Sequence, residues 1–416
     1  MDSFINLITL VEICDKLTYK DIKILLTINK SFNKIMNEDY FWNLLVNTKF
    51  KNAIGIKNNL TWKQLYLKYE NPKLYIFGKY RFGVNYEYDN DTVTLIKDLE
   101  NITQISCGLY HSAIIANGFL YTIGLNTKGE LGHSHEHEYK LVNPRRVPDL
   151  KNVTYVTCGN NVTGVIADNK LYTFGNNEYG ILGHKDINNI SIPTLIPNLE
   201  NPTTIAFGML HTAIIANGRL YTFGDNKFGQ LGHGHKHNLT VPTLVHTLKN
   251  VTKVSCGYYN TIVIADNKVY TFGWNFSGQL GHGHYNELTV PKAIDSLKNI
   301  TYVDSRGNSC AIVADGKLYT FGCNKHGQLG HHHTPDVNIP TIIPNLENVT
   351  FVSRGDAHTA VVSNNKLYTF GYITLGRACH TIQNINLILD IPTIVPNLEN
   401  IIYINCNLYS TAVLFI

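Results

Sequence analysis

Short apolar runs recur along most of the chain, and one run of five residues shows their spacing. This run, Leu-Tyr-Thr-Phe-Gly, predicts a β-strand that ends at a glycine. It occurs at 171–175, 220–224, 318–322 and 367–371, with near copies at 74–78, 120–124 and 269–273. Successive copies begin 46, 51, 49, 49, 49 and 49 residues apart. A fixed period of this size indicates stacked supersecondary units.

Each unit contains the same order of elements, as residues 297–346 illustrate. We expect a β-rich run at 300–303, a turn at 306–309, a second strand at 311–313, an Asp-Gly hairpin at 314–317 and a third strand at 318–321. A glycine-rich loop leads to a fourth strand at 339–343. Its Pro340 belongs on an edge strand, because proline lacks the donor for a sheet hydrogen bond. Four antiparallel strands per unit predict a propeller blade.

The two ends of the repeat region predict how the ring closes. The first-strand pattern occurs seven times, at 101–107, 152–158, 201–207, 250–256, 299–305, 348–354 and 400–406. The third-strand pattern begins one unit earlier, so the chain enters with third and fourth strands and leaves with first and second strands, at 400–406 and 411–416. Together these halves complete one mixed blade and remove the edges of an open ring. We therefore predict a mainly β protein, a seven-bladed β-propeller whose N- and C-terminal strands share one blade.

Residues 1–70 have a different, helical pattern. Leu10, Ile13, Cys14 and Leu17 form an apolar stripe at helical spacing, and residues 22–28 and 32–36 continue it. The segments 18–21 and 61–64 resemble capping boxes that open helices. Pro72 cannot continue a helix, so the predicted division is a small all-α domain at 1–70 and the propeller at 71–416.

Four segments of this helical region together resemble an F-box. They are Leu17-Thr18-Tyr19-Lys20-Asp21-Ile22, residues 29–35, Glu38-Asp39-Tyr40-Phe41-Trp42 and Trp62-Lys63-Gln64-Leu65-Tyr66. The early Leu-Pro pair of that family is replaced here by Ile5-Asn6. The resemblance implies binding to a Skp-type adaptor, and through it to a cullin, by Leu10, Ile13, Leu17, Ile22 and Leu25. The alternative is a helical cap that packs on the propeller.

The loop after the third strand identifies the type of propeller. Gly-x-Asn-x-x-Gly-x-Leu-Gly-His occurs, complete or nearly so, at 124–133, 175–184, 224–233, 273–282 and 322–331. Kelch repeats would contain a Gly-Gly pair and WD repeats a Trp-Asp pair, and the chain has neither. The repeat resembles that of the regulator of chromosome condensation family, over residues 74–416.

Charge and composition limit the classes of partner and the cell compartments that we expect. Residues 1–70 hold 10 lysines and 7 acidic residues, a balance of +3, which leaves 25 basic and 24 acidic residues, or +1, for the propeller. Such a neutral surface gives no electrostatic reason to expect nucleic acid or a membrane as partner. The N-terminus lacks a secretory signal, so we expect an intracellular protein, cytoplasmic or nuclear. Cys107, Cys158, Cys256 and Cys406 share one repeat position and are interpreted as buried apolar fillers.

Candidate chemistry is sparse. The glycine-rich loops are not followed by helices, so they are interpreted as tight turns and not as phosphate sites. Most of the 18 histidines lie in the loops after the third strands, where we expect a rim that gains charge at mildly acidic pH; a metal site is the less favoured alternative. His111, His211 and His358 are expected to be loop residues that support their neighbours. We predict no catalytic residues, no metal and no cofactor.

Two arginines are the candidate binding residues. Arg306 and Arg354 are taken to occupy the position that cysteine holds in four other repeats, close to Asp304 and Asp356. One interpretation is that each arginine pairs with a nearby carboxylate. The other is a spot near the channel mouth that binds an anion or a peptide.

Three functions follow from the two resemblances. The favoured one is the substrate receptor of an SCF-type cullin-RING ubiquitin ligase, whose propeller binds a client protein through its loops. The founding member of the propeller family implies a second, guanine nucleotide exchange on a small GTPase. The third is a scaffold with neither activity.

Overall fold

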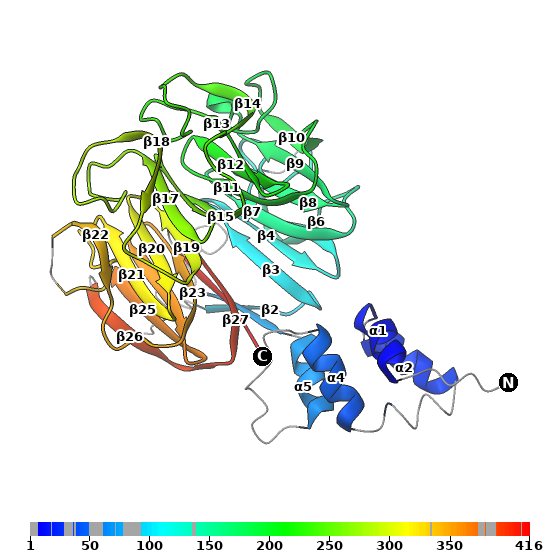
Figure 1. The fold of residues 1–416 in the computed structure, drawn as a ribbon. Coiled ribbons are helices and arrows are strands. Elements are labelled where there is room, and N and C mark those ends of the chain that lie inside the picture. Colours follow the sequence, from blue (N-terminus) through cyan, green and yellow to red (C-terminus); the bar gives the residue numbers. More distant parts are fainter. Residues whose placement is uncertain are drawn as a thin grey trace.

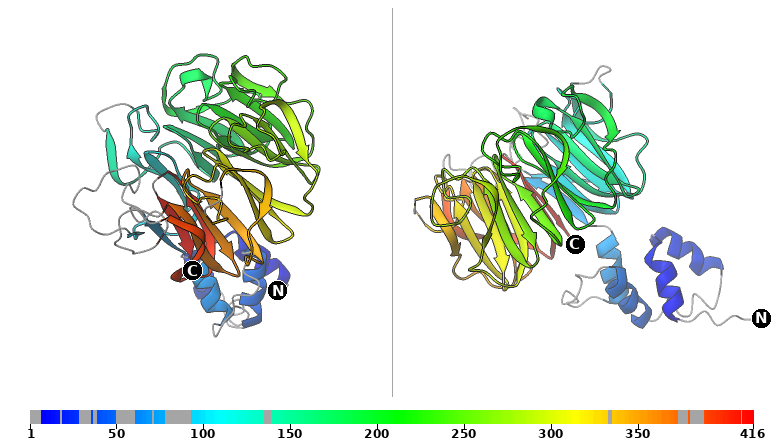
Figure 2. Two further views of the ribbon diagram at one scale, coloured as in Figure 1. Left: turned by 90° about the vertical axis from the view of Figure 1, so that its left-hand side faces the viewer. Right: turned by 45° about the horizontal axis from the view of Figure 1, so that its top comes forward.

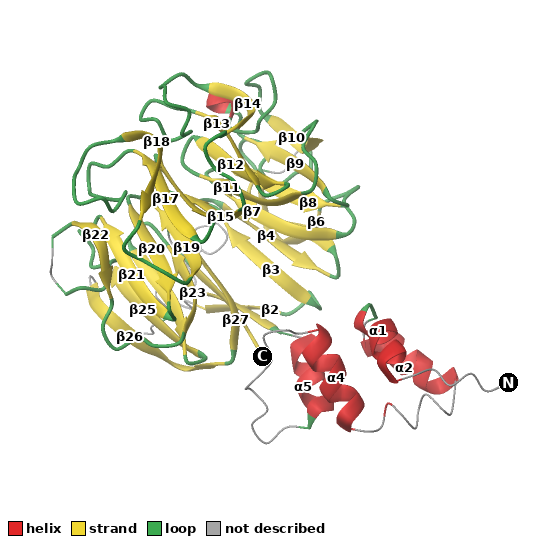
Figure 3. Ribbon diagram, viewed as in Figure 1, coloured by secondary structure: helices red, strands yellow, loops and turns green. Residues whose placement is uncertain are grey.

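The computed structural model describes residues 7–17, 19–28, 36, 39–49, 61–70, 72–77, 93–134, 139–332, 335–372, 379, 388–408 and 410–416. It contains a helical N-terminal region and a ring of seven four-stranded antiparallel sheets (Figure 1). Within the described ranges the helices are α1 (Leu7–Asp15), α2 (Tyr19–Ile28), α4 (Asp39–Lys49) and α5 (Trp62–Glu70), and the propeller contains the 3-10 turn η2 (Glu178–Gly180). Figure 3 shows the four α-helices together on one side of the strands, whereas η2 lies within the propeller.

Six blades each consist of four consecutive strands. Blades 1 to 3 are β3 (Ile102–Cys107), β4 (His111–Ala116), β5 (Phe119–Leu125) and β6 (Lys140–Arg146); β7 (Val153–Cys158), β8 (Val162–Ala167), β9 (Lys170–Gly175) and β10 (Ile190–Leu195); and β11 (Pro202–Phe207), β12 (His211–Ala216), β13 (Arg219–Gly224) and β14 (Leu239–Leu244). Blades 4 to 6 are β15 (Val251–Cys256), β16 (Asn260–Ala265), β17 (Lys268–Gly273) and β18 (Leu288–Ile294); β19 (Ile300–Arg306), β20 (Ser309–Ala314), β21 (Lys317–Gly322) and β22 (Val337–Ile342); and β23 (Val349–Arg354), β24 (His358–Ser363), β25 (Lys366–Tyr372) and β26 (Ile388–Glu399).

Blade 7 is assembled from both ends of the chain, which confirms the predicted closure. Its strands are β27 (Ile401–Cys406), β28 (Thr411–Phe415), β1 (Lys73–Phe77) and β2 (Val93–Ile96). The last strand pairs with the first in register, so that Tyr75 faces Val413. The side chain of Asn405 then accepts the backbone N–H of Cys107 in blade 1, at 2.7 Å. The chain ends are therefore held inside a sheet and across a blade junction.

The core lies between neighbouring blades. The phenylalanine of the repeated strand is fully buried in each of blades 2 to 6, at Phe174, Phe223, Phe272, Phe321 and Phe370. Each ring contacts the third glycine of the loop motif in the preceding blade. At Gly232, where φ is +78°, an added Cβ would lie 2.8 Å from the ring of Phe272. This close approach and the positive φ explain the glycine at that point of the motif.

A threonine and a histidine fasten the glycine-rich loop to its own blade. Thr222 in the repeated strand donates to the carbonyl of Leu231 at 2.7 Å, and its hydroxyl lies 2.9 Å from Nε2 of His233. Blades 1, 2, 4 and 5 repeat both contacts. The first histidine of each loop therefore has a structural role, with its ring half-buried.

Strand bounds differ from the expectation in one place that matters for the site. Residues 306 and 309 were expected in a turn, but Arg306 pairs with Ser309 as the last rung of β19 and β20. The turn is therefore only Gly307-Asn308, and Gly307 has a φ of +58°. The backbone of Arg306 is thus fixed by its pairing in the sheet.

The helices share one apolar core that touches blade 7. Thr61 and Gln64 exchange the two hydrogen bonds of the predicted capping box, at 2.9 and 3.2 Å. Ile402 and Ile416 of blade 7 pack against the helical core, and Figure 2 shows the helices beyond that side of the ring.

The other predicted capping box, at 18–21, and the segment 29–35 include residues outside the described part of the chain. Among the described helices, none is long and apolar enough to cross a membrane.

Candidate functional site

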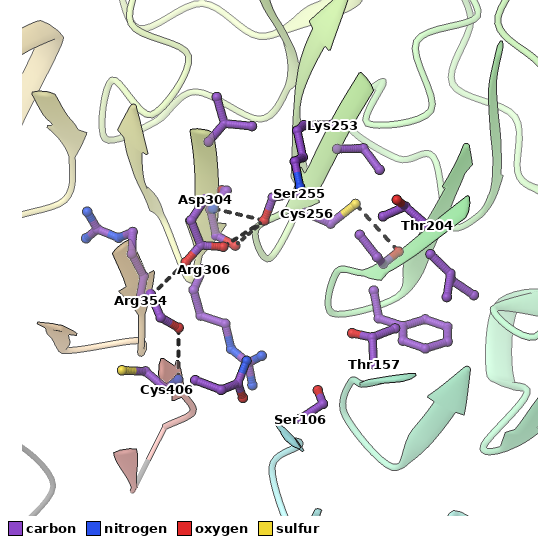
Figure 4. Close-up of a pocket in the computed structure, with 18 of the residues that line it drawn as sticks. Ser106, Thr157, Thr204, Lys253, Ser255, Cys256, Asp304, Arg306, Arg354 and Cys406 are labelled. Carbon is purple, nitrogen blue, oxygen red and sulfur yellow. Dashed lines mark hydrogen bonds between the residues drawn. The ribbon is translucent and has the colours of Figure 1, made fainter. Parts of the chain in front are cut away.

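The first strands of the seven blades, with the residue that follows each, line a central channel with three rings of residues, spaced two residues apart. The inner ring is Gln104, Tyr155, Thr204, Lys253, Tyr302, Phe351 and Tyr403, and the middle ring is Ser106, Thr157, Ala206, Ser255, Asp304, Ser353 and Asn405. The mouth ring is Gly108, Gly159, Gly208, Gly257, Arg306, Gly355 and Asn407. The inner and middle rings enclose a cavity of about 210 Å³ (Figure 4).

Most of the middle ring joins one blade to the next. The hydroxyl of Ser106 accepts the N–H of Cys158 at 2.9 Å, and Ser255 and Ser353 accept from blades 5 and 7 in the same way, at 3.0 and 2.9 Å. Asp304 takes this place in blade 5, where its Oδ2 accepts the N–H of Arg354 at 2.7 Å. The middle ring is therefore a seam between the blades, and its polar atoms are mostly used by the fold.

Asp304 is the one carboxylate in this seam. Its Oδ1 also accepts the hydroxyl of Ser255 at 3.0 Å, and Figure 4 shows both bonds. Burial raises the pKa of the Asp304 carboxyl, while the N–H of Arg354, Ser255 and the charges of Arg354 and Arg306 oppose that rise. A buried carboxylate needs such compensation to stay ionised.

Arg354 lies in the wall of the channel and is only 1% exposed. Its guanidinium donates to the carbonyls of Cys310, at 3.2 Å, and Gln328, at 3.3 Å, and to the hydroxyl of Ser309, all in blade 5. The side chain therefore turns away from the cavity into the junction of blades 5 and 6. The guanidinium of Arg354 therefore binds carbonyls and a hydroxyl and not the predicted carboxylate, because Asp304 accepts the backbone N–H of Arg354. At 1% exposure the guanidinium is not accessible to a ligand.

Arg306 does reach the channel mouth. Its Nε lies 3.7 Å from Oδ1 of Asp356, and Tyr258 donates its hydroxyl to the same carboxylate. The side chain of Arg306 is 23% exposed. Burial raises the pKa of Cys107 to about 11 and that of Cys158 to about 12, and the charge of Arg306, across the ring from blades 1 and 2, opposes both rises. The charge of Arg306 therefore acts across the opening.

The sheet register corrects the repeat alignment of the two arginines. Ser305 pairs with Cys310 as Cys256 pairs with Thr261, so Ser305 and not Arg306 occupies the cysteine position in blade 5. Arg354 does occupy it. Arg306 instead replaces a mouth-ring glycine. An added Cβ at Gly208 would lie 2.2 Å from the ring of His211, whereas in blade 5 the histidine position holds the small Ser309.

His111, His211 and His358 begin the second strands of their blades and are not loop residues. Each is fully buried, and its Nε2 contacts a threonine of the next blade: Thr163 at 2.8 Å, Thr261 at 3.0 Å and Thr411 at 2.8 Å. They do support neighbouring elements, as predicted. Burial lowers the pKa of His111 and of His211 to about 3, so both are neutral at physiological pH.

The loop histidines stack along the rim. His233 and His235 have ring centroids 5.7 Å apart, and His282 and His284 5.9 Å. Burial lowers the pKa of His233 and of His282 to about 4, so these first histidines of the loops remain neutral at mildly acidic pH. Within the described residues, no group of three His, Cys, Asp or Glu side chains is placed to hold a metal ion. The four cysteines interpreted as fillers are buried, with free thiols.

The five helical residues predicted to contact an adaptor separate into two groups. Leu10 and Ile22 are 1% and 0% exposed and belong to the helical core. Leu17 and Leu25 are half-buried against that core, and Ile13 is 43% exposed. Their role in adaptor binding stays a prediction, in which Leu10 and Ile22 would support the contact surface from beneath.

Sequence reasoning missed a group of aromatic residues next to the channel mouth, of which three are half-buried and one is exposed. Phe228, Tyr259, Trp274 and Phe276, here called the aromatic strip, come from the loops of blades 3 and 4. Phe228 has ring centroids 5.2 Å from Tyr259 and 5.4 Å from Trp274, and Trp274 stacks on Phe276 at 5.9 Å. Comparing equivalent loop positions between repeats would have found Phe276, since the other complete loop motifs carry polar residues there.

Comparisons with known proteins agree with the fold. The RCC1-like domain model matches residues 73–413. A segment of 110 residues is 31% identical to the human X-linked retinitis pigmentosa GTPase regulator and covers 25% of this chain and 11% of that protein. A segment of 128 residues is 35% identical to the mouse probable E3 ubiquitin-protein ligase HERC4, covering 28% and 12%. The matched segments thus span about a tenth of each relative.

Solved propellers resemble this one over most of its length. Yeast RCC1 (Prp20), in its complex with Kap60, superposes with a TM-score of 0.74 at 18% identity and covers 83% of this chain and 89% of its own. Human WBSCR16 superposes with a TM-score of 0.70 at 18% identity, covering 83% and 98%. At such identities the similarity establishes the fold alone.

Proposed function

The chain belongs to the RCC1-like domain family, and from that premise we propose that it is a non-enzymatic protein-binding module, the substrate receptor of an SCF-type cullin-RING ubiquitin ligase. In this proposal residues 1–70 form the domain that binds a Skp-type adaptor, and through it a cullin. The propeller, residues 71–416, binds the client protein.

The observation that carries the proposal is that the described parts of three F-box-like segments, 17–22, 38–42 and 62–66, pack as one unit. Asp39 accepts the N–H of Trp62 at 2.8 Å, which joins the starts of α4 and α5. The Trp42 ring lies 5.1 Å from that of Tyr66, and its Nε1 donates to the carbonyl of Met36 at 2.6 Å. Motif residues separated by 20 or more positions thus share one core. A helical cap would need only an apolar face toward the propeller.

This core leaves apolar side chains exposed to solvent. Ile13 of α1, Ile24 of α2 and Tyr40 of α4 are 43%, 58% and 59% exposed. In a small helical unit, side chains of this kind are the natural contacts for a protein partner. Leu17 and Leu25 are half-buried and add further apolar surface. The exposed and half-buried residues together are the proposed adaptor contacts.

The molecule presents its two proposed contact surfaces at opposite ends of the strands. The helical core contacts Ile402 near the start of β27 and Ile416 after the end of β28. Since β27 and β28 are antiparallel, the turn between them lies at the other end of blade 7, with the channel mouth. A client on the loops would therefore leave the helices free for an adaptor.

Adaptor capture by the full chain tests the proposal. Purified Skp-type adaptor should be captured by the full chain, and the Ile13→Asp, Ile24→Asp double variant should lose at least about 90% of that capture, since two charges replace contact apolar surface. The matched control is Ile187→Asp, which alters an equally exposed isoleucine, 62%, in a loop of blade 2. No capture by the unaltered chain, under conditions in which a known F-box protein binds, would rule out the receptor function.

Guanine nucleotide exchange on a small GTPase is the second candidate. It is favoured by the superposition with Prp20p of Saccharomyces cerevisiae, described for its binding to Gsp1p and histones, at a TM-score of 0.73 over 83% of this chain. Release of a fluorescent guanine nucleotide from purified GTPases would reveal this activity. An acceleration by the full chain, together with no adaptor capture, would favour exchange over the receptor function.

A further inference from the structure

The aromatic strip and the channel mouth form one continuous surface. Tyr259 donates its hydroxyl to the sulfur of Met209 at 3.4 Å, and Met209 lines a second cavity of about 90 Å³ at the mouth. That cavity is also lined by Leu109, Tyr258, Leu408, Arg306 and Asp356. Its volume is that of about three molecules of liquid water. The surface therefore runs from a largely apolar pocket on the channel axis outward over stacked rings to the edge of blade 4.

Among the five complete loop motifs, only that of blade 4 has an aromatic residue directly after the asparagine. The asparagine that begins each complete loop tip accepts an N–H five residues later, which fixes the equivalence of the tips. The residue after that asparagine is Thr127, Glu178, Lys227, Phe276 and Lys325 in blades 1 to 5. Phe276 is 72% exposed. An aromatic side chain stacked on tryptophan and left in water adds little to folding, whereas such side chains dominate binding surfaces.

Two lysines flank the exposed ring. Lys227 and Lys325 hold the equivalent tip positions in the blades on either side of Phe276, and both are exposed. The Nζ of Lys227 lies 5.6 Å from the ring centroid of Phe228. In the described part of the chain, neither lysine has a carboxylate within ion-pair distance. Unpaired cations beside apolar rings favour a ligand that offers both carboxylates and apolar side chains.

The inner end of the surface argues against a polyphosphate ligand. Asp356 lies in the mouth cavity, with Tyr258 and Arg306 already bound to it. A nucleic acid backbone crossing the mouth would meet this carboxylate, and the propeller as a whole carries almost no net positive charge. A peptide in which apolar and acidic residues alternate can instead place an apolar side chain in the mouth and its carboxylates beside the outer lysines.

We propose that the aromatic strip and the channel mouth bind an extended acidic segment of a partner protein that carries bulky apolar side chains. The apolar side chains pack on Phe276, Trp274 and Phe228, and one reaches the cavity beside Tyr258. The carboxylates lie next to Lys227 and Lys325. This inference rests on the proposed function, because it takes the loop end of the propeller as the client side, and it specifies the class of client sequence.

Three arrays of fluorescein-labelled peptides test the proposal with the full chain. All share alternating positions that hold Leu, Ile, Phe or Trp, and the intervening positions are Glu, Gln or Lys. A labelled oligouridylate is the fourth probe. Fluorescence anisotropy should show the Glu array binding at least about 10-fold more tightly than the Gln array, with affinity falling as salt is raised. Phe276→Ser should weaken the best Glu peptide by at least about 10-fold.

Charge reversal separates recognition from mere support of the fold. The Lys227→Glu, Lys325→Glu double variant should bind the Lys array in preference to the Glu array. The matched control, Lys128→Glu, alters the tip of blade 1 and should leave the original preference unchanged. Equal binding of the three arrays, no binding by any peptide, or preferential binding of the oligouridylate would each overturn the proposal.

The failure of this inference can be told from failure of the receptor function. Phe276→Ser lies at the loop end, so it should leave adaptor capture intact. Adaptor capture without peptide binding would refute only the client class. Peptide binding without adaptor capture would refute the receptor function and leave the client class standing.

Discussion

Two junctions of the propeller solve the same packing problem with different chemistry. Between blades 3 and 4, the neutral ring of His211 contacts Thr261 across the junction. Between blades 5 and 6, Ser309 stands at the histidine position, and the guanidinium of Arg354 enters from the next blade to bind its hydroxyl and two carbonyls. A neutral junction needs one partner, whereas a buried charge needs several acceptors and a nearby carboxylate, here Asp304. The difference shows that one fold position tolerates a charge only where its neighbours change with it.

Removing the buried charge is expected to have the largest effect. Arg354→Ala should lower the free energy of unfolding by about 3 to 5 kcal/mol, because the buried carbonyls and the hydroxyl that it binds would lose their donor and Asp304 would lose a nearby positive charge. Urea unfolding followed by fluorescence measures this change. The Asp304→Ser, Arg354→Cys double variant resembles the Ser106–Cys158 seam and should lose less than the single variant. An equal or larger loss in the double variant would show that the charge pair does not govern this junction.

The neutral junctions should weaken in acid. Folding lowers the pKa of His111 and His211 from 6.5 to about 3, so the unfolded chain binds protons that the folded chain excludes. Stability contributed by each histidine is complete above about pH 6.5 and should fall by about 1.4 kcal/mol per pH unit below it, until the pH nears 3. Unfolding free energies at a series of pH values measure the slope. His211→Asn, which copies Asn260 of blade 4, should reduce the slope by about 1.4 kcal/mol per pH unit, the contribution of one proton. An unchanged slope would contradict the lowered pKa of His211.

Loss of the threonine hydroxyl that fastens the glycine-rich loop to its blade should give the smallest of the three changes in stability. Thr222→Val removes the hydroxyl that binds Leu231 and His233 and should cost about 1 kcal/mol. Thr243→Val is the control in the same blade, because the Thr243 hydroxyl binds only Val241 on the exposed edge strand, and it should change stability by less than about 0.5 kcal/mol. Equal losses in thermal or urea unfolding would argue against the clasp.

Much of the fold could be predicted because the same strand pattern recurs in each repeat. The strands around Leu318 and the closing strands at 401–406 and 411–415 lie where the repeat period placed them. The candidate site was harder, because it depends on departures from the repeat. Arg306 was assigned to the cysteine position since an alignment by turns cannot tell the last strand residue from the first turn residue. Only the pairing of Arg306 with Ser309 settles it.

The sequence by itself determined the number of blades, the shared closing blade and the family, because these follow from a period that any local segment repeats. Only the tertiary structure decided that Arg354 is buried while Arg306 reaches the mouth, and that Phe228 meets Trp274 from another blade. The physical reason is that burial and contact across blades depend on which side chains converge from segments about 50 residues apart. A period records that such segments are equivalent, and the way their individual side chains share the space between blades appears only once the ring is closed.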